Sequence, residues 1–365
     1  MSETSKSNIS GPLRWGLAPL AGLYGGIMAF RNHLYNIGYR RSLTFEPLII
    51  SVGNLSVGGT GKSPMVEYLV RLISAHKPLA ILSRGYKRKT RGVRIAGEED
   101  TAATLGDEPF QFYRKFGQQS LASDHKVVVA VAERRGEAIP EILFVHPEVE
   151  VILLDDAFQH RSVQADFQLL LTTFQRPFYQ DSVLPMGRLR EYRKGAGRAD
   201  AVVVTKCPEG LSAKEQENIR DRIRRYSRPE VPVFFSSIRY EAPQPVFEPS
   251  LQLREPLLLF SGLADSSLFE QQLKKHYEVK EHIRWEDHHT YAEADFEKVK
   301  AAQAASVLTT EKDMVKLLEP AQAKLWQQLP LFYLPIRTYF LTEGQQFDDL
   351  ILRQLSSPIK DKNIE

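Results

Sequence analysis

Short apolar runs alternate with helical stretches along most of the chain. Runs rich in Val, Ile and Leu predict strands at 48–52, 79–82, 126–131, 149–154, 167–171 and 201–205. Because these runs are almost continuously apolar rather than alternating, we expect a parallel sheet that is buried on both faces. The stretch 64–75 predicts a helix that starts near a proline, where the missing N–H costs nothing. This alternation predicts an α/β fold.

A second, smaller set of elements follows in the last third of the chain. It comprises predicted strands at 257–260 and 306–309, helices at 268–276 and 296–305, and an apolar run at 331–336. The intervening residues 232–249 are rich in proline and predict an extended interdomain connection. We therefore predict three parts: an N-terminal membrane-associated helical segment over 1–40, a core domain over 41–235, and a smaller C-terminal α/β domain over 236–365.

The N-terminal segment has an uncharged run of sixteen residues from Trp15 to Phe30, bracketed by Arg14 and Arg31. As a helix this run covers about 24 Å, which is short of the roughly 30 Å hydrocarbon core of a bilayer. Its apolar side chains recur at helical spacing, at Leu17, Leu20, Ala21, Tyr24, Ile27 and Met28. We expect a helix lying in the membrane interface. A signal peptide and a helix packed on its own domain are the alternatives.

Composition and charge narrow the class of partner. A content of 42% hydrophobic and 25% charged residues is typical of a folded globular protein. The formal net charge is only +3, yet the basic residues are clustered. Residues 84–94 hold six cations and no carboxylate, and residues 188–198 hold five cations and one carboxylate. Such clusters suit phosphate-rich partners or form a solvated face. Cys207 is the only cysteine, which excludes an internal disulfide and fits a reducing cytosol.

A glycine-rich segment follows the first predicted strand and opens a helix. It reads Gly58, Gly59, Thr60, Gly61, Lys62 and Ser63. Its backbone N–H groups can turn towards the β- and γ-phosphates of a nucleotide, with the lysine as a point charge and the serine hydroxyl as a Mg²⁺ ligand. The consensus G-x-x-x-x-G-K-[ST] is met except at its first glycine, where Ser56 stands. The segment predicts a P-loop.

Two carboxylates end another predicted strand. Asp155 and Asp156 follow the apolar run 149–154, and Gln159 and His160 come shortly after. In open α/β sheets the carboxyl ends of strands bind ligands. One carboxylate of the pair suits a metal ion and the other suits orientation of the attacking group, although the residues do not show which does which. An ordinary turn at the end of a strand is the alternative.

Together these motifs resemble those of tetraacyldisaccharide 4′-kinase, the lipid A 4′-kinase family. The resemblance extends over nearly the whole chain and rests on segments 53–64, 83–86, 106–109, 155–160, 189–191, 287–288 and 310–313, in the expected order. Two positions depart from the family: Ser63 stands where Thr is frequent, and Ala157 where Gly is frequent. The serine keeps the hydroxyl, and the alanine only restricts the backbone.

The resemblance implies a P-loop α/β/α sandwich with a second, smaller α/β domain, and a kinase that uses ATP and Mg²⁺. Its acceptor would be the 4′-hydroxyl of tetraacyldisaccharide 1-phosphate, the lipid A precursor. It implies that Asp107 acts as a base with His288 as its partner, and that Asp155 and Asp156 are also catalytic, holding the metal with Ser63. The implied substrate-binding residues are Asn54, Arg134, Gln159, His160, Arg190 and Glu191.

From the residue types alone, these choices stay open at three positions. A lone Asp107 in a Gly-Asp-Glu-Pro turn is ordinarily a turn former, His288 has His289 beside it, and Arg134 has Arg135 beside it. If His288 comes from another domain than Asp107, closure would complete the site.

We expect peripheral or monotopic attachment to the cytoplasmic face of the bacterial inner membrane. The basic clusters and the N-terminal segment would contact its anionic surface, and neither nucleic acid nor a protein partner is implied. Two rival functions remain. A P-loop NTPase that acts as a switch or motor would hydrolyse nucleotide under the control of a partner. A membrane-bound scaffold would carry a vestigial nucleotide site.

Overall fold

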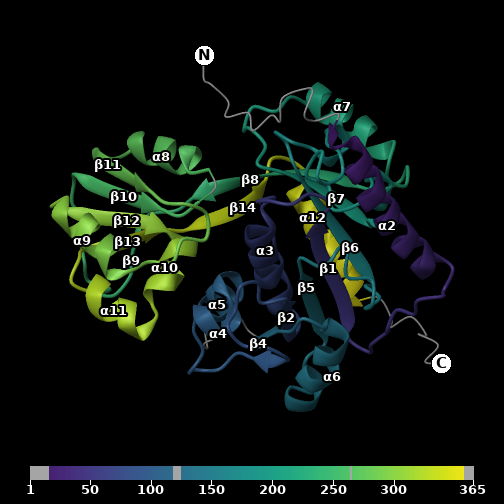
Figure 1. The fold of residues 1–365 in the computed structure, drawn as a ribbon, viewed down its shortest axis with the longest axis horizontal. Helices are drawn as coiled ribbons and strands as arrows, with labels where there is room; N and C mark the ends of the chain where they lie inside the picture. Colours follow the sequence, from purple (N-terminus) through teal and green to yellow (C-terminus); the bar gives the residue numbers. More distant parts are fainter. Residues whose placement is uncertain (1–15, 118–124, 264, 357–365) are drawn as a thin grey trace. The chain divides into compact units, whose positions relative to one another are not determined.

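The computed structural model describes residues 16–117, 125–263 and 265–356, and its chain forms two compact units. Unit 1 is drawn from residues 1–73, 148–237 and 339–365, and unit 2 from residues 74–147 and 238–338. Each unit therefore combines segments that lie far apart in the sequence, as the colours of Figure 1 show. The division at residues 40 and 235 that we drew from the sequence remains a prediction.

Unit 1 is built on a parallel sheet. Its strands are β1 (Leu48–Asn54), β5 (Val151–Asp155), β6 (Phe167–Thr173), β7 (Ala201–Thr205) and β8 (Val233–Tyr240). They lie in the order β8-β7-β6-β1-β5, and every neighbouring pair is parallel. The register sets Val52 opposite Asp155 and Gly53 opposite Leu170. Parallel strands end at the same edge, so the loops that follow β1, β5 and β7 meet there.

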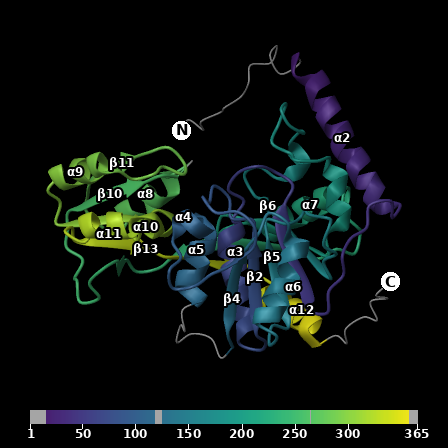
Figure 2. The same ribbon diagram turned by 60° about the horizontal axis from the view of Figure 1, so that its bottom comes forward.

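Helices cover both faces of this sheet. They are α2 (Ala18–Asn36), α3 (Lys62–Ser74), α7 (Ala213–Arg224) and α12 (Gly344–Ser356), with 3₁₀ turns at Phe178–Gln180 and Arg193–Arg198. Phe234 of β8 packs against Phe347 of α12, whereas its neighbour Phe235 joins a cluster with Ala21 of α2 and Ile223 of α7. Successive strand residues point to opposite faces. The unit is therefore an α/β/α sandwich, with α2 at its periphery (Figures 1 and 2).

Unit 2 contains two groups of strands. In the first, β2 (Leu79–Ser83) pairs in parallel with β4 (Val127–Val131), and β3 (Arg94–Ile95) pairs antiparallel to β4. The helical segments of this part are α4 (Ala102–Leu105), α5 (Asp107–Phe112), a π-helical turn at Tyr113–Gly117 and α6 (Arg135–Val145). Residue Asp107 begins α5, and the preceding Gly106 has φ +95°, a conformation that glycine adopts without strain.

The second group is a five-stranded sheet in the order β11-β10-β12-β13-β9. Its strands are β11 (Val279–Arg284), β10 (Leu257–Ser261), β12 (Ser306–Thr310), β13 (Leu331–Leu334) and β9 (Gln244–Pro245), and only the β13–β9 pair is antiparallel. The surrounding helices are α8 (Ser267–Lys274), α9 (Glu293–Ala301), α10 (Glu311–Leu317) and α11 (Pro320–Trp326). Phe260 and Leu259 of β10 face opposite clusters, so this sheet too is covered on both faces.

The α/β prediction is confirmed, and each predicted strand forms to within a few residues. Within residues 232–249, which we predicted to be an extended interdomain connection, the chain passes from unit 1 to unit 2 after Ser237. Residues 233–240 of this range form β8, a strand that the sequence analysis did not predict, and Phe235 is buried in the core of unit 1. Pro232 stands just before this strand, where its missing N–H breaks no ladder hydrogen bond. Strand β14 (Ile336–Phe340) then leads the chain back to unit 1.

The N-terminal apolar segment forms α2. Some residues of its predicted apolar stripe pack on the protein, and others are exposed. Ala21 and Tyr24 pack on unit 1, whereas Leu20 and Ile27 are exposed together with Leu23 and Phe30. Gly25 permits this packing, because a Cβ there would lie 2.5 Å from the Tyr192 ring. Among the described residues, no helix is long and apolar enough to cross a membrane. Trp15 and Arg14 lie outside the described residues.

Candidate active site

The P-loop begins where β1 leaves the sheet. A Cβ on Gly53 would lie 2.7 Å from both the backbone N and the Cβ of Phe158, so the loop after β5 crosses β1 at a position that only glycine fits. Gly58 and Gly61 have φ values of +107° and +81°. Ser56, the departure from the P-loop consensus, forms a bridge with Leu189. Its backbone is thus engaged in an ordinary strand-like contact and needs no glycine.

Side chains from neighbouring strands brace this loop. Asn54 Nδ2 donates to Thr60 Oγ1 at 2.6 Å, and Thr205 Oγ1 donates to the Thr60 carbonyl at 2.8 Å. Lys206, directly after β7, donates to the Gly59 carbonyl at 2.9 Å. The loop conformation is therefore held by the protein itself. This pre-organisation lowers the entropy cost of placing backbone N–H groups around a phosphate.

Two cations share the carboxylate of Asp156. Arg190 binds it with both branches of its guanidinium, Nη1 to Oδ1 at 2.9 Å and Nη2 to Oδ2 at 3.1 Å. Lys62 Nζ lies 3.7 Å from the same Oδ1, and the lysine side chain is 11% exposed. Asp156 has φ +46°, a left-handed conformation that Asp tolerates better than most residues. Lys62 of the P-loop and Asp156 of the acidic pair thus lie side by side.

The same place offers the ligands that Mg²⁺ prefers. Asp155 is buried at the end of β5, Asp156 follows it, and Ser63 follows Lys62 at the start of α3, so all three residues carry oxygen donors. Mg²⁺ is ordinarily bound by one or two carboxylates together with substrate phosphates rather than by a full protein cage. In the described part of the chain no cluster of three or more His, Cys, Asp or Glu could hold a metal alone. The donor chemistry therefore fits Mg²⁺ held jointly with a nucleotide.

A buried network surrounds Glu191. Arg198 donates to both of its carboxylate oxygens at 2.7 and 2.9 Å, and Asn32 of α2 donates to Oε2 at 2.7 Å. Gln159 joins Glu191 Oε1 to the Asn54 carbonyl through its Nε2 at 3.0 and 2.9 Å. Four of the predicted substrate-binding residues, Asn54, Gln159, Arg190 and Glu191, therefore lie in one connected region. Hydrogen bonds within the protein therefore fix the positions of these side chains.

In unit 2 the structure brings Asp107 and His288 together. Asp107 Oδ2 lies 3.5 Å from His288 Nδ1, and both side chains are about one quarter exposed. His288 has φ +62° and sets its ring edge-on to Tyr86, with centroids 5.9 Å apart. Although 181 positions separate the two residues in sequence, they belong to the same compact unit. His288 therefore does not come from a different unit than Asp107.

Lysines flank this pair. Lys316 Nζ lies 3.9 Å from Asp107 Oδ2 and contacts the buried Asp313 at 3.1 Å. Lys312 Nζ lies 3.4 Å from His288 Nε2 and 2.8 Å from Asp287. Burial acts to raise the pKa of Asp287, but the hydrogen bond and charge of Lys312 outweigh it, so that its pKa lies below its usual value. Two lysines, each paired with a second carboxylate, thus flank the Asp107–His288 pair.

The neighbouring His289 has different partners. Its Nε2 lies 2.9 Å from Asp295, and its ring stacks on Trp285 with an interplanar angle of 11°. His289 is thus held by its contacts with Asp295 and Trp285, whereas His288 faces Asp107. The sequence could not separate these two histidines.

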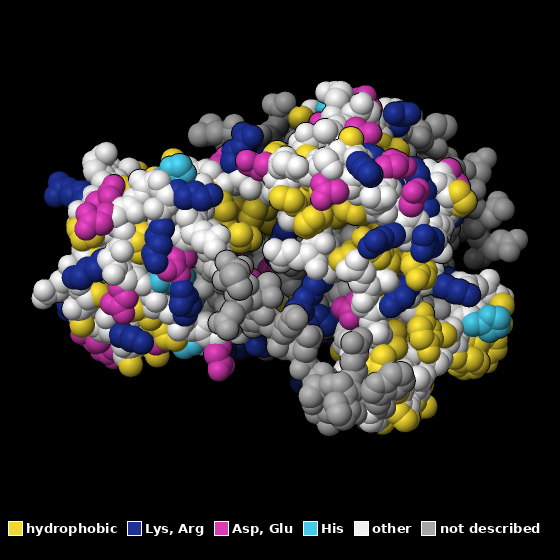
Figure 3. Space-filling view, turned by 90° about the horizontal axis from the view of Figure 1, so that it is seen from above, with side chains coloured by type: hydrophobic (Ala, Val, Ile, Leu, Met, Phe, Trp, Pro, Cys, Tyr) yellow, Lys and Arg dark blue, Asp and Glu magenta, His cyan; other side chains and the backbone are white. Residues whose placement is uncertain are grey.

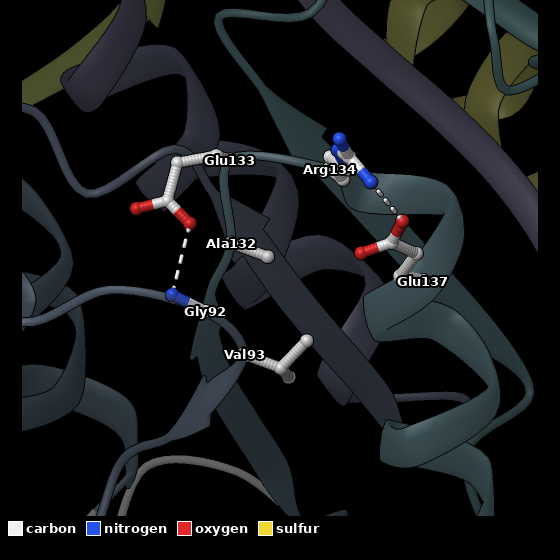
Figure 4. Close-up of a pocket in the computed structure, with 6 residues that line it drawn as sticks. All are labelled: Gly92, Val93, Ala132, Glu133, Arg134 and Glu137. Atoms are coloured by element: carbon white, nitrogen blue, oxygen red, sulfur yellow. Dashed lines mark hydrogen bonds and ion pairs between the residues drawn. The ribbon is translucent and has the colours of Figure 1, made fainter.

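Arg134 and His160 are placed differently from the other predicted residues. Arg134, at the start of α6, is 80% exposed and pairs with Glu137 at 2.9 Å. Figure 4 shows this pair beside a cavity of about 210 Å³, where Glu133 also accepts a hydrogen bond from the Gly92 backbone N–H. His160 lies in unit 1, 2.9 Å from the Ser162 hydroxyl.

The two basic clusters are partly used for internal contacts. Arg88 has a side chain that is 2% exposed and binds Glu133, and Arg94 binds Asp100. In the second cluster, Arg190 and Arg198 bind Asp156 and Glu191. On the face seen in Figure 3, Lys and Arg side chains are interspersed with Asp and Glu. Fewer cations are therefore available to an external anionic surface than the sequence suggested.

Sequence reasoning missed several residues around the P-loop. They are Asn32 of α2, Arg198, Thr205 and Lys206. One signal was available for Thr205 and Lys206, which end a predicted strand at the edge where ligands bind. Asn32 had none, because the contact of α2 with Glu191 depends on tertiary packing.

Comparison with known families decides the wider identity. Residues 13–356 match the family model described as tetraacyldisaccharide-1-P 4′-kinase, LpxK. The chain belongs to the tetraacyldisaccharide-1-phosphate 4′-kinase family. As a member of this family it is a kinase, and the family resemblance inferred from its motifs is confirmed.

Relatives and a solved structure agree with this placement in the kinase family. The tetraacyldisaccharide 4′-kinase of Flavobacterium johnsoniae is 42% identical, over 95% of this chain and 99% of its own length. That of Bacteroides thetaiotaomicron is 37% identical, over 91% and 90%. A crystal structure of LpxK from Aquifex aeolicus, described as an "apo" form in complex with ATP, is 31% identical with a TM-score of 0.70, covering 94% of this chain and 99% of that one.

Proposed function

We propose that this chain transfers the γ-phosphoryl group of ATP to the 4′-hydroxyl of tetraacyldisaccharide 1-phosphate, a step of lipid A biosynthesis. The observation that carries the proposal is the convergence of Lys62, Asp156 and Arg190 beside a braced P-loop. Phosphoryl transfer relies chiefly on positioning and on cations that stabilise the charge of the transferring group. The family membership supplies the acceptor.

Residues Gly58 to Ser63 would hold the triphosphate. Mg²⁺, when bound by Ser63 and by Asp155 or Asp156, would neutralise phosphate charge. Arg190 keeps Asp156 in place through a fork of two hydrogen bonds, a geometry that lysine could not reproduce. Lys62 lies close enough to this carboxylate to be held ready for the β- and γ-phosphates.

Asp107 would accept the proton of the attacking hydroxyl, with His288 as its partner. The support is the 3.5 Å approach of His288 Nδ1 to Asp107 Oδ2. Lys312 Nζ lies 3.4 Å from the other ring nitrogen of His288, and Lys316 Nζ lies 3.9 Å from the Asp107 carboxylate. A positioned base of this kind contributes about 10²- to 10⁴-fold to a rate.

Asn54, Gln159, His160, Arg190 and Glu191 would contact the acceptor, because they surround the loops that follow β1 and β5. The ordered network of Glu191 gives these contacts fixed positions. Arg134 is proposed for the same role on family resemblance, although its side chain here pairs with Glu137.

The enzyme would work at the cytoplasmic face of the inner membrane, to which α2 attaches it. Leu20, Leu23, Ile27 and Phe30 form a stripe along α2, and each is at least 55% exposed. Burying such side chains in the interface is favourable by about 1.5–3 kcal/mol each at most. An acceptor with four acyl chains stays in the membrane, so an enzyme bound there meets it directly.

Phosphotransfer is tested directly with labelled ATP and the tetraacylated disaccharide monophosphate. We expect a bisphosphorylated lipid from the wild type and none from Lys62→Ala, which should keep the wild-type fold by circular dichroism. ATP hydrolysis that a partner stimulates, without a lipid product, would instead indicate a switch or motor. No turnover of either kind would favour the scaffold.

Membrane attachment is tested by flotation with vesicles of anionic and of zwitterionic lipid. The double variant Leu23→Glu with Ile27→Glu should lose vesicle binding, because both side chains are exposed and the change leaves the core intact. Phe144→Glu is the matched control, since Phe144 is 89% exposed on α6, outside the stripe. Undiminished binding of the double variant would contradict the role of α2.

A further inference from the structure

A cavity of about 240 Å³ lies on one face of the unit 1 sheet, beneath the loop 157–165. Its floor includes Ser51, Leu154 and Gln168, which the register aligns across β5, β1 and β6. Tyr35 from the end of α2 and Arg198 contribute to its walls. The volume equals that of roughly eight waters at about 30 Å³ each, which is enough for one small polar group.

The lining of this cavity carries cations and no acid. Arg161, Arg198 and His160 line it, and the described lining residues include neither Asp nor Glu. Arg198 has a carboxylate partner in Glu191, which lies outside the lining. Among the described residues, the Arg161 guanidinium forms no ion pair: it donates a hydrogen bond to the Asn32 carbonyl and lies over the Tyr35 ring. Burial and the nearby charge of Arg198 lower the pKa of Arg161.

Polar atoms of the lining also lack protein partners. The Ser51 hydroxyl is buried, with the residue 3% exposed, and has no hydrogen-bond partner in the described structure. The Nε of Arg198 is likewise buried without a partner there. Buried polar groups are nearly always satisfied, so groups left open around one polar cavity indicate a ligand or water that satisfies them. Arg161 and Arg198 together carry two positive charges against the single carboxylate of Glu191, and the remaining positive charge favours an anion in the cavity.

We propose that this cavity binds a phosphate group. Its source is either the 1-phosphate of the acceptor, in which case the inference rests on the proposed function, or free phosphate. The acceptor is favoured because the cavity loop also carries Gln159 and His160, which are proposed to contact it. A phosphate there would accept hydrogen bonds from Arg161 and Arg198 and would hold the disaccharide by the end away from the reacting hydroxyl.

Two variants test the charge of the cavity. Arg161→Gln removes a cation, and Gln164→Glu places a carboxylate in the lining with almost no change in shape; Gln164 is exposed, so folding should be unaffected. Gln180→Glu is the matched control, because it is an equally exposed glutamine outside the lining. Acceptors with and without the 1-phosphate are compared by kcat/KM, alongside the KM for ATP.

We expect the wild type to prefer the 1-phosphorylated acceptor by about 10-fold or more, the contribution of one charge-assisted hydrogen bond. Arg161→Gln and Gln164→Glu should lose this preference through KM, with unchanged KM for ATP and unchanged turnover of the acceptor that lacks the phosphate. Gln180→Glu should behave as the wild type.

Inorganic phosphate supplies a readout that does not depend on kinase activity. With a non-hydrolysable ATP analogue filling the P-loop, phosphate should raise the Tm of the wild type but not that of the two cavity variants. If phosphate raises the Tm of the wild type but not of the cavity variants, and the variants keep the wild-type preference for the 1-phosphorylated acceptor, the cavity binds free phosphate. If both variants keep the wild-type preference and the wild-type Tm response, the proposal is wrong. Because the Tm arm needs no lipid product, it decides the matter even if the proposed function fails.

Discussion

His288 and His289 are adjacent, yet their surroundings predict opposite consequences when each is replaced by alanine. His288 touches Asp107 at 3.5 Å and meets Tyr86 only at the ring edge. A contact at the limit of hydrogen bonding stabilises little, so His288→Ala should lower the free energy of unfolding by less than about 1 kcal/mol. As the partner of the proposed base, however, it should lower kcat by about 100-fold or more.

For His289 the structure predicts the reverse. Its hydrogen bond to Asp295 at 2.9 Å contributes about 1 kcal/mol, and its contacts with the rings of Trp285 and Tyr291 add about 0.5–1.5 kcal/mol. His289→Ala should therefore lower the free energy of unfolding by about 2 kcal/mol. That corresponds to a fall in Tm of about 4–8 °C for a unit of this size. Its kcat at a temperature where the protein stays folded should change by less than about 5-fold.

The assay pairs initial rates of lipid phosphorylation with thermal unfolding for each variant. His288→Asn accompanies His288→Ala as a control, because Asn tolerates the left-handed conformation at φ +62° but cannot act as a proton acceptor at neutral pH. Both His288 variants should be equally slow. If His289→Ala lowers kcat as much as His288→Ala does, without a greater loss of Tm, the assignment of the dyad is refuted.

Two further predictions follow from local packing and charge. Gly53→Ala should lower the free energy of unfolding by about 1–3 kcal/mol, because its Cβ would meet the Phe158 backbone at 2.7 Å, whereas Gly22→Ala, which has open space, should not destabilise; urea unfolding distinguishes them. Lys274, His282 and Arg284 lower the pKa of Glu270 to about 2. The stability that Glu270 contributes is then present above pH 4.5 and lost as the pH falls towards 2. The difference in unfolding free energy between wild type and Glu270→Gln should be present from pH 5 to 7 and shrink below pH 4, as Glu270 becomes protonated. A difference that grows below pH 4 would contradict this ion cluster.

The strands of unit 1 and its nucleotide loop were predictable from sequence because their causes are local. A continuous apolar run such as 201–205 predicts a buried parallel strand wherever it occurs, and β7 has these very bounds. The P-loop likewise depends on glycines next to Lys62. Residues 233–240 were missed as a strand because the prolines around them suggested a connection, and only pairing with β7 shows why Phe235 is buried.

Residues that depend on tertiary contacts were beyond sequence reasoning. The roles of Asn32 and Arg198 arise from Glu191, a buried carboxylate that needs several donors. Nothing in the spacing of these residues indicates that they meet. The same limit applied to His288, since only the placement of Asp107 at the start of α5 distinguishes it from His289.

Asp156 explains why the loop after β5 and the segment around Arg190 must fold together. A carboxylate in a left-handed turn beside the P-loop is costly unless cations hold it, and Lys62 and Arg190 both do so. In the proposed reaction, the phosphate oxygens of ATP would compete with Asp156 for Lys62, while the fork of hydrogen bonds from Arg190 would still hold the carboxylate in place. Because Arg190 would stay paired with Asp156, Lys62 could move from the carboxylate to the phosphates. We therefore expect Arg190 to act as a positioning residue that keeps Asp156 oriented while Lys62 engages the phosphates.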